Sequence, residues 1–281
     1  MREYTLTAEL IMAYGEHLKN QEHCAGTVEK YLRDTRAFVR WLGDGRMTEE
    51  SAAAWKEHLQ NLNYAPTTIN SMLAALNGLF RFLGWDDCRV RFLKVQRRLF
   101  RESNKELSRE EYSLLLATAR SMGRERLELL METICATGIR VSEVRFITVE
   151  AIQLGRAEVA LKGKIRTILI PNKLARKLMK YARKQKIVSG EIFLTRNGKG
   201  VSRRQIWAEM KALCKKAGVA PTKVFPHNLR HLFATVFYKV SRDLIKLADI
   251  LGHSSVETTR IYLLTSGQEH QQQMERLGLV L

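Results

Sequence analysis

Amphipathic helical patterns run through most of this chain, and a single β-rich segment interrupts them. In residues 28–42 the apolar side chains recur every three or four positions, on one face of a helix. Similar patterns cover residues 51–62 and 67–84, separated by a break at Gly43–Arg46 and a turn at Ala65-Pro66. We therefore expect residues 1–93 to form a compact helical bundle.

A different kind of sequence follows this bundle. Residues 94–106 have poor periodicity and five basic side chains, so we expect an interdomain linker there. Ser108, with Glu111 three residues later, then predicts the capped start of a new helix. The linker predicts that the chain has two domains.

The second domain is expected over residues 107–281. Its β-rich segment, residues 157–170, is interrupted by Lys162-Gly163-Lys164, which predicts a hairpin turn. The other patterns are helical, at residues 109–122, 124–137, 142–147, 173–185, 202–218 and 229–240. The predicted fold class is mainly α with a small β-sheet, a helical N-terminal bundle followed by a C-terminal mixed α/β domain.

Positive charge is concentrated in the second part of the chain. The net charge is +18, yet residues 1–93 carry 11 Lys and Arg against 12 Asp and Glu. Residues 94–281 carry 36 basic and 17 acidic side chains. This asymmetry predicts a polyanionic partner for the second part, with nucleic acid as the first candidate and an anionic membrane surface as the second.

Several classes of protein do not fit this composition. Hydrophobic residues make up 45% of the chain, which argues against global disorder. No apolar run approaches the ~20 residues that a membrane-spanning helix needs, and the first ten residues lack the apolar core of a signal peptide. Because the cysteines are scattered, we expect reduced thiols in a cytosolic protein, without zinc or disulfides: Cys24, Cys88, Cys135 and Cys214.

Four separated segments carry side chains suited to phosphate chemistry. Each of these side chains, taken singly, has an ordinary structural explanation, and His231 beside Arg230 is expected to be structural. Together they form a set that can act on one phosphodiester. The segments are ATGIRVSEV with Arg140 and Glu143, the turn with Lys162 and Lys164, HNLRHLFAT with His227 and Arg230, and LGHSSVETTRIY with His253 and Tyr262.

These residue types predict transfer of a phosphodiester onto a tyrosine. Two arginines can hold the non-bridging oxygens of one phosphate, and they stabilise the charge that gathers on it in the transition state. A histidine can move a proton near neutral pH, and a lysine can donate one to a leaving alkoxide. A tyrosine needs such surroundings to act as a nucleophile. No carboxylate cluster for two metal ions and no Walker loop accompany them, so the expected chemistry is metal-free.

In order and spacing, these segments resemble the signature boxes of the tyrosine recombinase family, also called the lambda-integrase or phage integrase family. The boxes appear here as TGIRVSE, HNLRH and LGHSSVETTRIY. The N-terminal bundle resembles the SAM-like core-binding domain of that family, so the resemblance covers nearly the whole chain. It implies a minimal, Xer-like two-domain recombinase, with residues 1–93 and 107–281 forming a C-shaped clamp on DNA.

The resemblance also implies roles for the site residues. Tyr262 would form a 3′-phosphotyrosine, while Arg140 and Arg230 would hold the scissile phosphate. His227 would assist proton transfer and His253 would hydrogen-bond the phosphate. The remaining implied roles are Lys162 as general acid to the leaving 5′-oxygen, with Lys164 as the alternative, and Glu143 as a brace that does not react.

The implied partners are double-stranded DNA with specific recombination sites and further copies of the chain. A C-terminal helix would dock on a neighbouring protomer to form a homotetramer on DNA, accessory DNA-bending proteins could assist, and neither cofactor, metal, ATP nor membrane is expected. The expected location is the cytoplasm, in association with the nucleoid of a bacterium. Ser202, Arg203 and Arg204 are candidate DNA contacts because a helix N-terminus suits phosphate. Further candidates, which would serve equally well as solvent-facing charges, are Arg33, Arg36 and Arg40.

Two other functions compete with recombination. A type IB topoisomerase-like enzyme would use similar residues to relax supercoils as a monomer, and a DNA-binding protein would bind without cutting. The core-binding resemblance argues against the first, and the intact catalytic set argues against the second. Within recombination, the sequence leaves open integration and excision, inversion, and dimer resolution.

Overall fold

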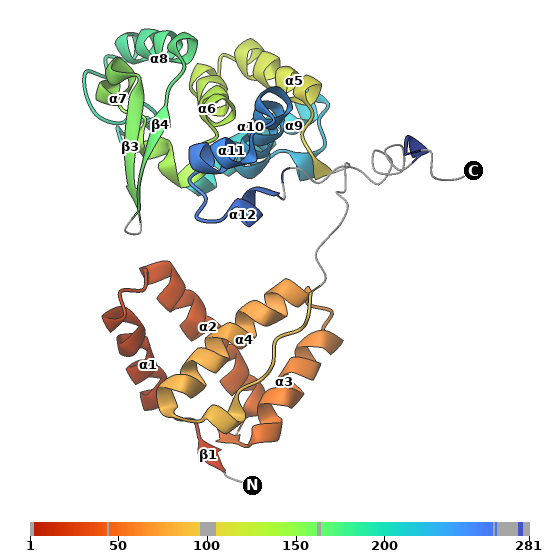
Figure 1. Ribbon diagram of the computed structural model, residues 1–281. Coiled ribbons are helices and arrows are strands. Elements are labelled where there is room, and N and C mark those ends of the chain that lie inside the picture. The colour runs from red at the N-terminus through yellow and green to blue at the C-terminus, as the bar shows by residue number, and fades with distance from the viewer. Residues whose placement is uncertain are drawn as a thin grey trace. The chain divides into compact units, whose positions relative to one another are not determined.

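The computed structural model describes residues 3–43, 45–95, 105–161, 164–260, 262 and 275–277. The chain divides into two compact units, Met1–Arg97 and Arg98–Leu281 (Figure 1). Each unit is built around buried apolar side chains. The expected linker of residues 94–106 and the expected C-terminal helix near residues 267–281 lie largely outside the described residues. Their assignments remain predictions.

The first unit is the expected helical bundle. Its described helices pack around a core that includes Phe38, Trp55 and Phe80. Proline at the start of the last helix and Gly84 just beyond it, at φ 73°, mark that helix as the sequence predicts. The elements are β1 (Tyr4–Thr5), α1 (Ala8–Asn20), α2 (Ala25–Leu42), β2 (Arg46–Met47), α3 (Glu49–Asn61), α4 (Pro66–Leu83) and the 3₁₀ helix η1 (Asp86–Cys88), with β1 and β2 antiparallel.

The second unit is mixed α/β, which confirms the predicted fold class. It begins with the predicted capping box, in which Ser108 accepts from the backbone N–H of Glu111 and Glu111 accepts from that of Ser108. Its elements are α5 (Arg109–Ser121), α6 (Glu125–Thr137), η3 (Val141–Phe146), α7 (Val149–Leu154), β3 (Arg156–Leu161), β4 (Lys164–Leu169), α8 (Asn172–Lys184), α9 (Arg203–Ala217), η4 (Pro221–Lys223), α10 (Pro226–Ser241), α11 (Leu244–Leu251) and α12 (Val256–Arg260).

The strands β3 and β4 form the predicted hairpin. They pair in antiparallel register from Arg156 with Leu169 to Leu161 with Lys164. Alternate residues of the hairpin point into the core, among them Ala157, Val159 and Ile168.

The segment before Tyr262 contains two short helices. Asp243 caps α11 by accepting from the backbone N–H of Lys246, and Gly252 ends it at φ 63°. His253 follows at once, α12 covers the threonine pair, and Tyr262 comes two residues after α12. In the described ranges no helix combines the length and the hydrophobicity that crossing a bilayer requires.

Candidate active site

The C-terminal end of α11 gathers three arginines from separate segments. The last carbonyl groups of a helix lack partners within the helix and carry the negative end of its dipole, so they favour cations. Here three consecutive carbonyls each accept a hydrogen bond from a guanidinium. The pairs are Arg166 Nη1 to Ile250 (3.1 Å), Arg230 Nη2 to Leu251 (2.8 Å) and Arg140 Nη2 to Gly252 (3.3 Å).

Arg230 is the most buried of these arginines, at 2% exposure. It extends from α10, and its Nη1 also donates to the carbonyl of Gly138 at 2.6 Å, where α6 ends. Burial and, after it, the charge of Arg140 lower the pKa of Arg230 to about 10, while Tyr262 opposes this shift. Arg230 therefore stays charged at neutral pH.

Glu143 is a buried carboxylate held by two arginines. It lies in η3, one turn after Arg140, and is 2% exposed. Its Oε1 accepts from Arg140 Nη1 at 3.0 Å, while its Oε2 accepts from the Arg140 backbone N–H at 2.7 Å and from Arg166 Nη2 at 2.5 Å. Both carboxylate oxygens thus have hydrogen-bond donors, and the contact with Oε1 holds the guanidinium of Arg140 in place.

Arg166 is the site residue that the sequence analysis missed. It lies on β4 with its side chain turned toward the core, on the same strand face as the buried Ile168 and Ile170. Arg166 occupies a core-facing position in a strand whose residues alternate between core and solvent, and a charged side chain in such a position needs a buried partner. This position in the sequence pattern could have marked Arg166 as a site residue. The partners are Glu143 and the end of α11.

His253 is held in one tautomer. Its Nε2 lies 3.0 Å from Arg230 Nη2, and its Nδ1 lies 2.8 Å from Thr259 Oγ1 on α12. Since arginine can only donate, Nε2 accepts, and the ring proton resides on Nδ1. Burial, together with Arg230 and Arg140, lowers the pKa of His253 to about 4, so the imidazole is neutral at pH 7.

Tyr262 lies against three imidazole rings and is 4% exposed. The His253 ring stacks on it with centroids 5.9 Å apart, and the His227 ring lies at 6.5 Å. His231, expected to be structural, packs edge-on at 4.9 Å. Burial and the charges of Arg230 and Arg140 lower the pKa of His227, so a neutral imidazole able to accept a proton lies beside the tyrosine.

The two candidate lysines are not distinguished by these contacts. Lys162 lies outside the described residues, and Lys164 is the first residue of β4, paired with Leu161. Lys164 belongs to the hairpin that also carries Arg166. Which of the two serves as general acid remains a prediction.

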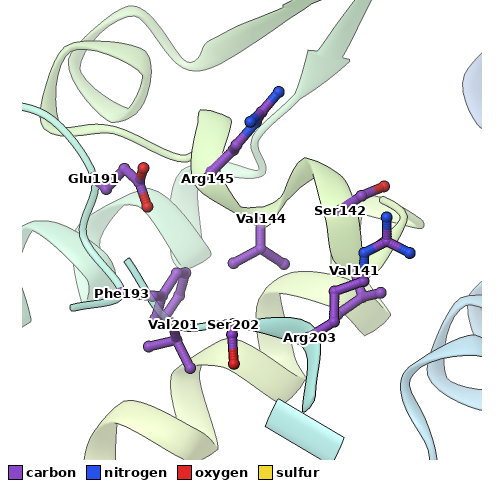
Figure 2. Close-up of a pocket in the computed structure, with 9 residues that line it drawn as sticks. All are labelled: Val141, Ser142, Val144, Arg145, Glu191, Phe193, Val201, Ser202 and Arg203. Carbon is purple, nitrogen blue, oxygen red and sulfur yellow. The ribbon is translucent and has the colours of Figure 1, made fainter. Parts of the chain in front are cut away.

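The candidate DNA contacts come from two helices, with Ser202, Arg203 and Arg204 at the start of α9 and Arg33, Arg36 and Arg40 on α2. Ser202 and Arg203, at the N-terminus of α9, line a pocket with Ser142 and Arg145 from η3 (Figure 2). Ser202 also caps α9, accepting from the backbone N–H of Gln205 at 3.2 Å. Arg204 is exposed beside them, and Arg33, Arg36 and Arg40 line a groove of the first unit with Val39. Their role in binding DNA remains a prediction.

Among the residues described, no three His, Cys, Asp or Glu side chains converge as metal ligands would.

Sequence comparisons identify the same two units. The profile of the "Phage integrase family" matches residues 105–269, and that of the "Phage integrase, N-terminal SAM-like domain" matches residues 11–87. "Tyrosine recombinase XerA" of Thermococcus kodakarensis is 30% identical, covering 97% of this chain and 96% of the relative. The XerA of Pyrococcus furiosus is 29% identical over 100% of this chain and 98% of the relative.

Solved structures share the fold. The crystal structure of XerA recombinase aligns with a TM-score of 0.52 at 22% identity, over 96% of this chain and 98% of that one. A Tn1549 transposon integrase in complex with transposon right end DNA gives 0.70 at 17% identity, over 96% and 99%. A lambda integrase tetramer bound to a Holliday junction gives 0.73 at 20% identity, over 90% and 76%.

Proposed function

The chain belongs to the phage integrase family and is a tyrosine-type site-specific recombinase, and we propose that Tyr262 is the nucleophile with which it cuts and rejoins DNA. The observation that carries this proposal is the position of Tyr262, which is buried against three imidazoles and lies close enough to Arg230 to oppose the lowering of its pKa. A phenol with pKa ~10 needs both a proton acceptor and nearby positive charge to attack phosphorus.

Arg140 and Arg230, which we call the arginine clamp, stabilise the transition state. As the Tyr262 oxygen bonds to phosphorus, negative charge collects on the non-bridging oxygens, and donors already aimed there need no reorganisation. A guanidinium has five N–H donors, so the contacts of Arg230 with Gly138, Leu251 and His253 leave it donors for a phosphate oxygen. Arg140 supplies the second set of donors.

Proton transfer accompanies the attack at both ends. The phenol proton passes to the neutral imidazole of His227, and the phosphorus–O5′ bond breaks as a proton reaches the leaving oxygen. The hairpin lysine, Lys162 or its alternative Lys164, donates that proton. His253 hydrogen-bonds the phosphate once its Nε2 carries a proton. In rejoining, a 5′-hydroxyl attacks the phosphotyrosine and these transfers reverse.

This chemistry requires neither metal nor ATP. The phosphotyrosine bond retains the energy of the broken phosphodiester, so rejoining proceeds without a further source of energy. Charge on the phosphate is neutralised by guanidinium groups instead of a cation.

The proposed partners are DNA and other copies of this chain. DNA with specific recombination sites would contact Ser202, Arg203 and Arg204 in residues 107–281, and Arg33, Arg36 and Arg40 in residues 1–93. Relatives of known structure include a tetramer on a Holliday junction, which supports a homotetramer joined through the C-terminal helix. Accessory DNA-bending proteins could assist.

The proposed location is the cytoplasm, in association with the nucleoid. The relatives come from archaea as well as bacteria, so they support neither origin over the other.

Capture of covalent adducts tests the proposal. Wild-type protein and Tyr262→Phe, which keeps the buried ring and loses only the hydroxyl, are incubated with sheared DNA from the protein's own source. Detergent-resistant complexes are isolated and their DNA is sequenced. We expect adducts at a defined site from wild type, none from Tyr262→Phe, and equal retention of DNA by both on a native gel.

Three outcomes would contradict the proposal. Adducts from both proteins would assign the nucleophile to another residue. DNA retention without adducts from either protein would favour a binding role. Relaxation of supercoiled DNA that needs no specific site would favour a topoisomerase-like enzyme.

A further inference from the structure

We propose that Arg166 is a positioning residue that acts through Glu143 to hold Arg140 on the scissile phosphate. The inference rests on the proposed function, since it assumes that Arg140 binds that phosphate. Arg166 is less accessible to a phosphate than Arg140 is, because its side chain is 13% exposed whereas that of Arg140 is 42% exposed. Its two Nη nitrogens donate to Glu143 and to the end of α11.

Arg166 determines how Glu143 is oriented. Oε2 of Glu143 is shared between the Arg140 backbone N–H and Arg166, which leaves Oε1 for the Arg140 guanidinium. Without Arg166, the buried Oε2 would accept only from the backbone N–H of Arg140. The carboxylate could then turn its vacated oxygen toward the guanidinium, drawing Arg140 away from the phosphate.

Arg166 also sets the charge of the site. Arg140, Arg166 and Arg230 together with Glu143 carry a net charge of +2, and removal of Arg166 would leave +1. The influence of this third guanidinium reaches the other groups, because Arg166 contributes to the lowered pKa of both Arg230 and His253. A phosphorane that gathers negative charge would therefore meet a weaker positive field.

The backbone leaves room for this arrangement at Gly252. A Cβ on Gly252 would lie 2.5 Å from Cδ and 2.8 Å from Nη1 of Arg166. The end of α11 is thus shaped to let the Arg166 side chain pass beneath it to Glu143.

A double-mutant cycle with a matched substrate pair tests the inference. The variants are Arg166→Met, Arg166→Lys, Arg140→Ala and the double variant Arg140→Ala/Arg166→Met. Arg156→Met, an exposed position on the same hairpin, is the control for the loss of one charge. Each cleaves the duplex site mapped by adduct capture, once with a phosphodiester and once with a methylphosphonate at the scissile position.

We expect Arg166→Met to slow cleavage of the phosphodiester about 10- to 100-fold, the usual worth of a charge-assisted hydrogen bond. Binding of DNA is expected to stay unchanged. An uncharged methylphosphonate depends less on the arginines, so Arg166→Met should slow its cleavage by a smaller factor. In the Arg140→Ala background the same substitution should cost less than in wild type, since the residue it positions is gone and only its contribution to the positive field remains. Arg166→Lys, which retains the charge, should recover part of the rate.

Three results would overturn the inference. Equal losses on both substrates would mean that Arg166 only stabilises the fold, and so would full additivity with Arg140→Ala. A rate equal to that of Arg156→Met would mean that Arg166 has no part in cleavage. If wild type itself formed no adduct, the proposed function would fail first, and that result is distinct from these three.

Discussion

Nε2 of His253 lies 3.0 Å from the guanidinium of Arg230 and accepts its hydrogen bond. A protonated imidazole has no acceptor, so this contact requires the neutral form. The opposite nitrogen donates to Thr259, which orients the ring. The histidine thus enters the reaction neutral and aligned, and it can change its tautomer once a phosphate oxygen replaces one of these partners.

Thr259→Val should reduce the rate of DNA cleavage. Valine keeps the shape of threonine and removes the hydroxyl that accepts from Nδ1 of His253, so the ring loses its fixed tautomer. The loss of one neutral hydrogen bond predicts an effect of about 2- to 10-fold in single-turnover cleavage. Thr259→Ser should restore the rate. Thr258→Val, at the exposed neighbouring position, serves as the control. Equal rates for the two valine variants would refute the role of Thr259.

Thermal stability should fall as the pH drops below about 6.5, the usual pKa of an unfolded histidine. The pKa of folded His253 is lowered to about 4 by burial and by the neighbouring arginines, and that of His227 is lowered as well. Between these pH values the unfolded chain binds more protons than the folded protein does, so stability rises with pH across this window and levels off below about 4. Melting temperatures measured from pH 4 to 8 should show a steeper slope for wild type than for His253→Gln. Parallel curves would contradict the assignment.

Gly252→Ala should destabilise the protein more than Gly218→Ala does. Both glycines end a helix at positive φ, 63° and 67°, so both substitutions carry the same backbone strain. Only at Gly252 does the added Cβ meet a side chain, that of Arg166, whereas at Gly218 the space is open. The difference should be about 1–3 kcal/mol in the free energy of unfolding. Cleavage should also slow in Gly252→Ala alone, and equal behaviour of the two variants would refute the close approach of Arg166.

Arg203→Ala should weaken DNA binding and flatten its dependence on salt. If Arg203 contacts one phosphate, the slope of log K against log salt should shrink by ~0.9. Lys19→Ala removes the same charge from an exposed side chain paired with Glu16 and should leave the slope unchanged. Gel-shift titrations at several salt concentrations make the comparison. A slope for Arg203→Ala equal to that of wild type would remove Arg203 from the interface.

Local chemistry along the chain was enough to predict much of this molecule. Pro66 and Gly84 bound α4, and Ser108 with Glu111 starts α5, because these signals act between residues a few positions apart. Arg140 and Glu143 are likewise three residues apart, so their pairing follows from one helical turn. The motif order in turn predicted which side chains belong to one site.

Contacts between distant segments decided the rest. Arg166 appears in the sequence as one more basic residue of a strand, yet its partner Ile250 lies 84 residues away. Thr258 and Thr259 are adjacent and chemically identical, and only the packing of α12 buries the second beside His253. The charge states of His253 and His227 depend on burial and on arginines from other segments. Desolvation and Coulomb energies follow distances in space, which a local pattern of residues does not encode.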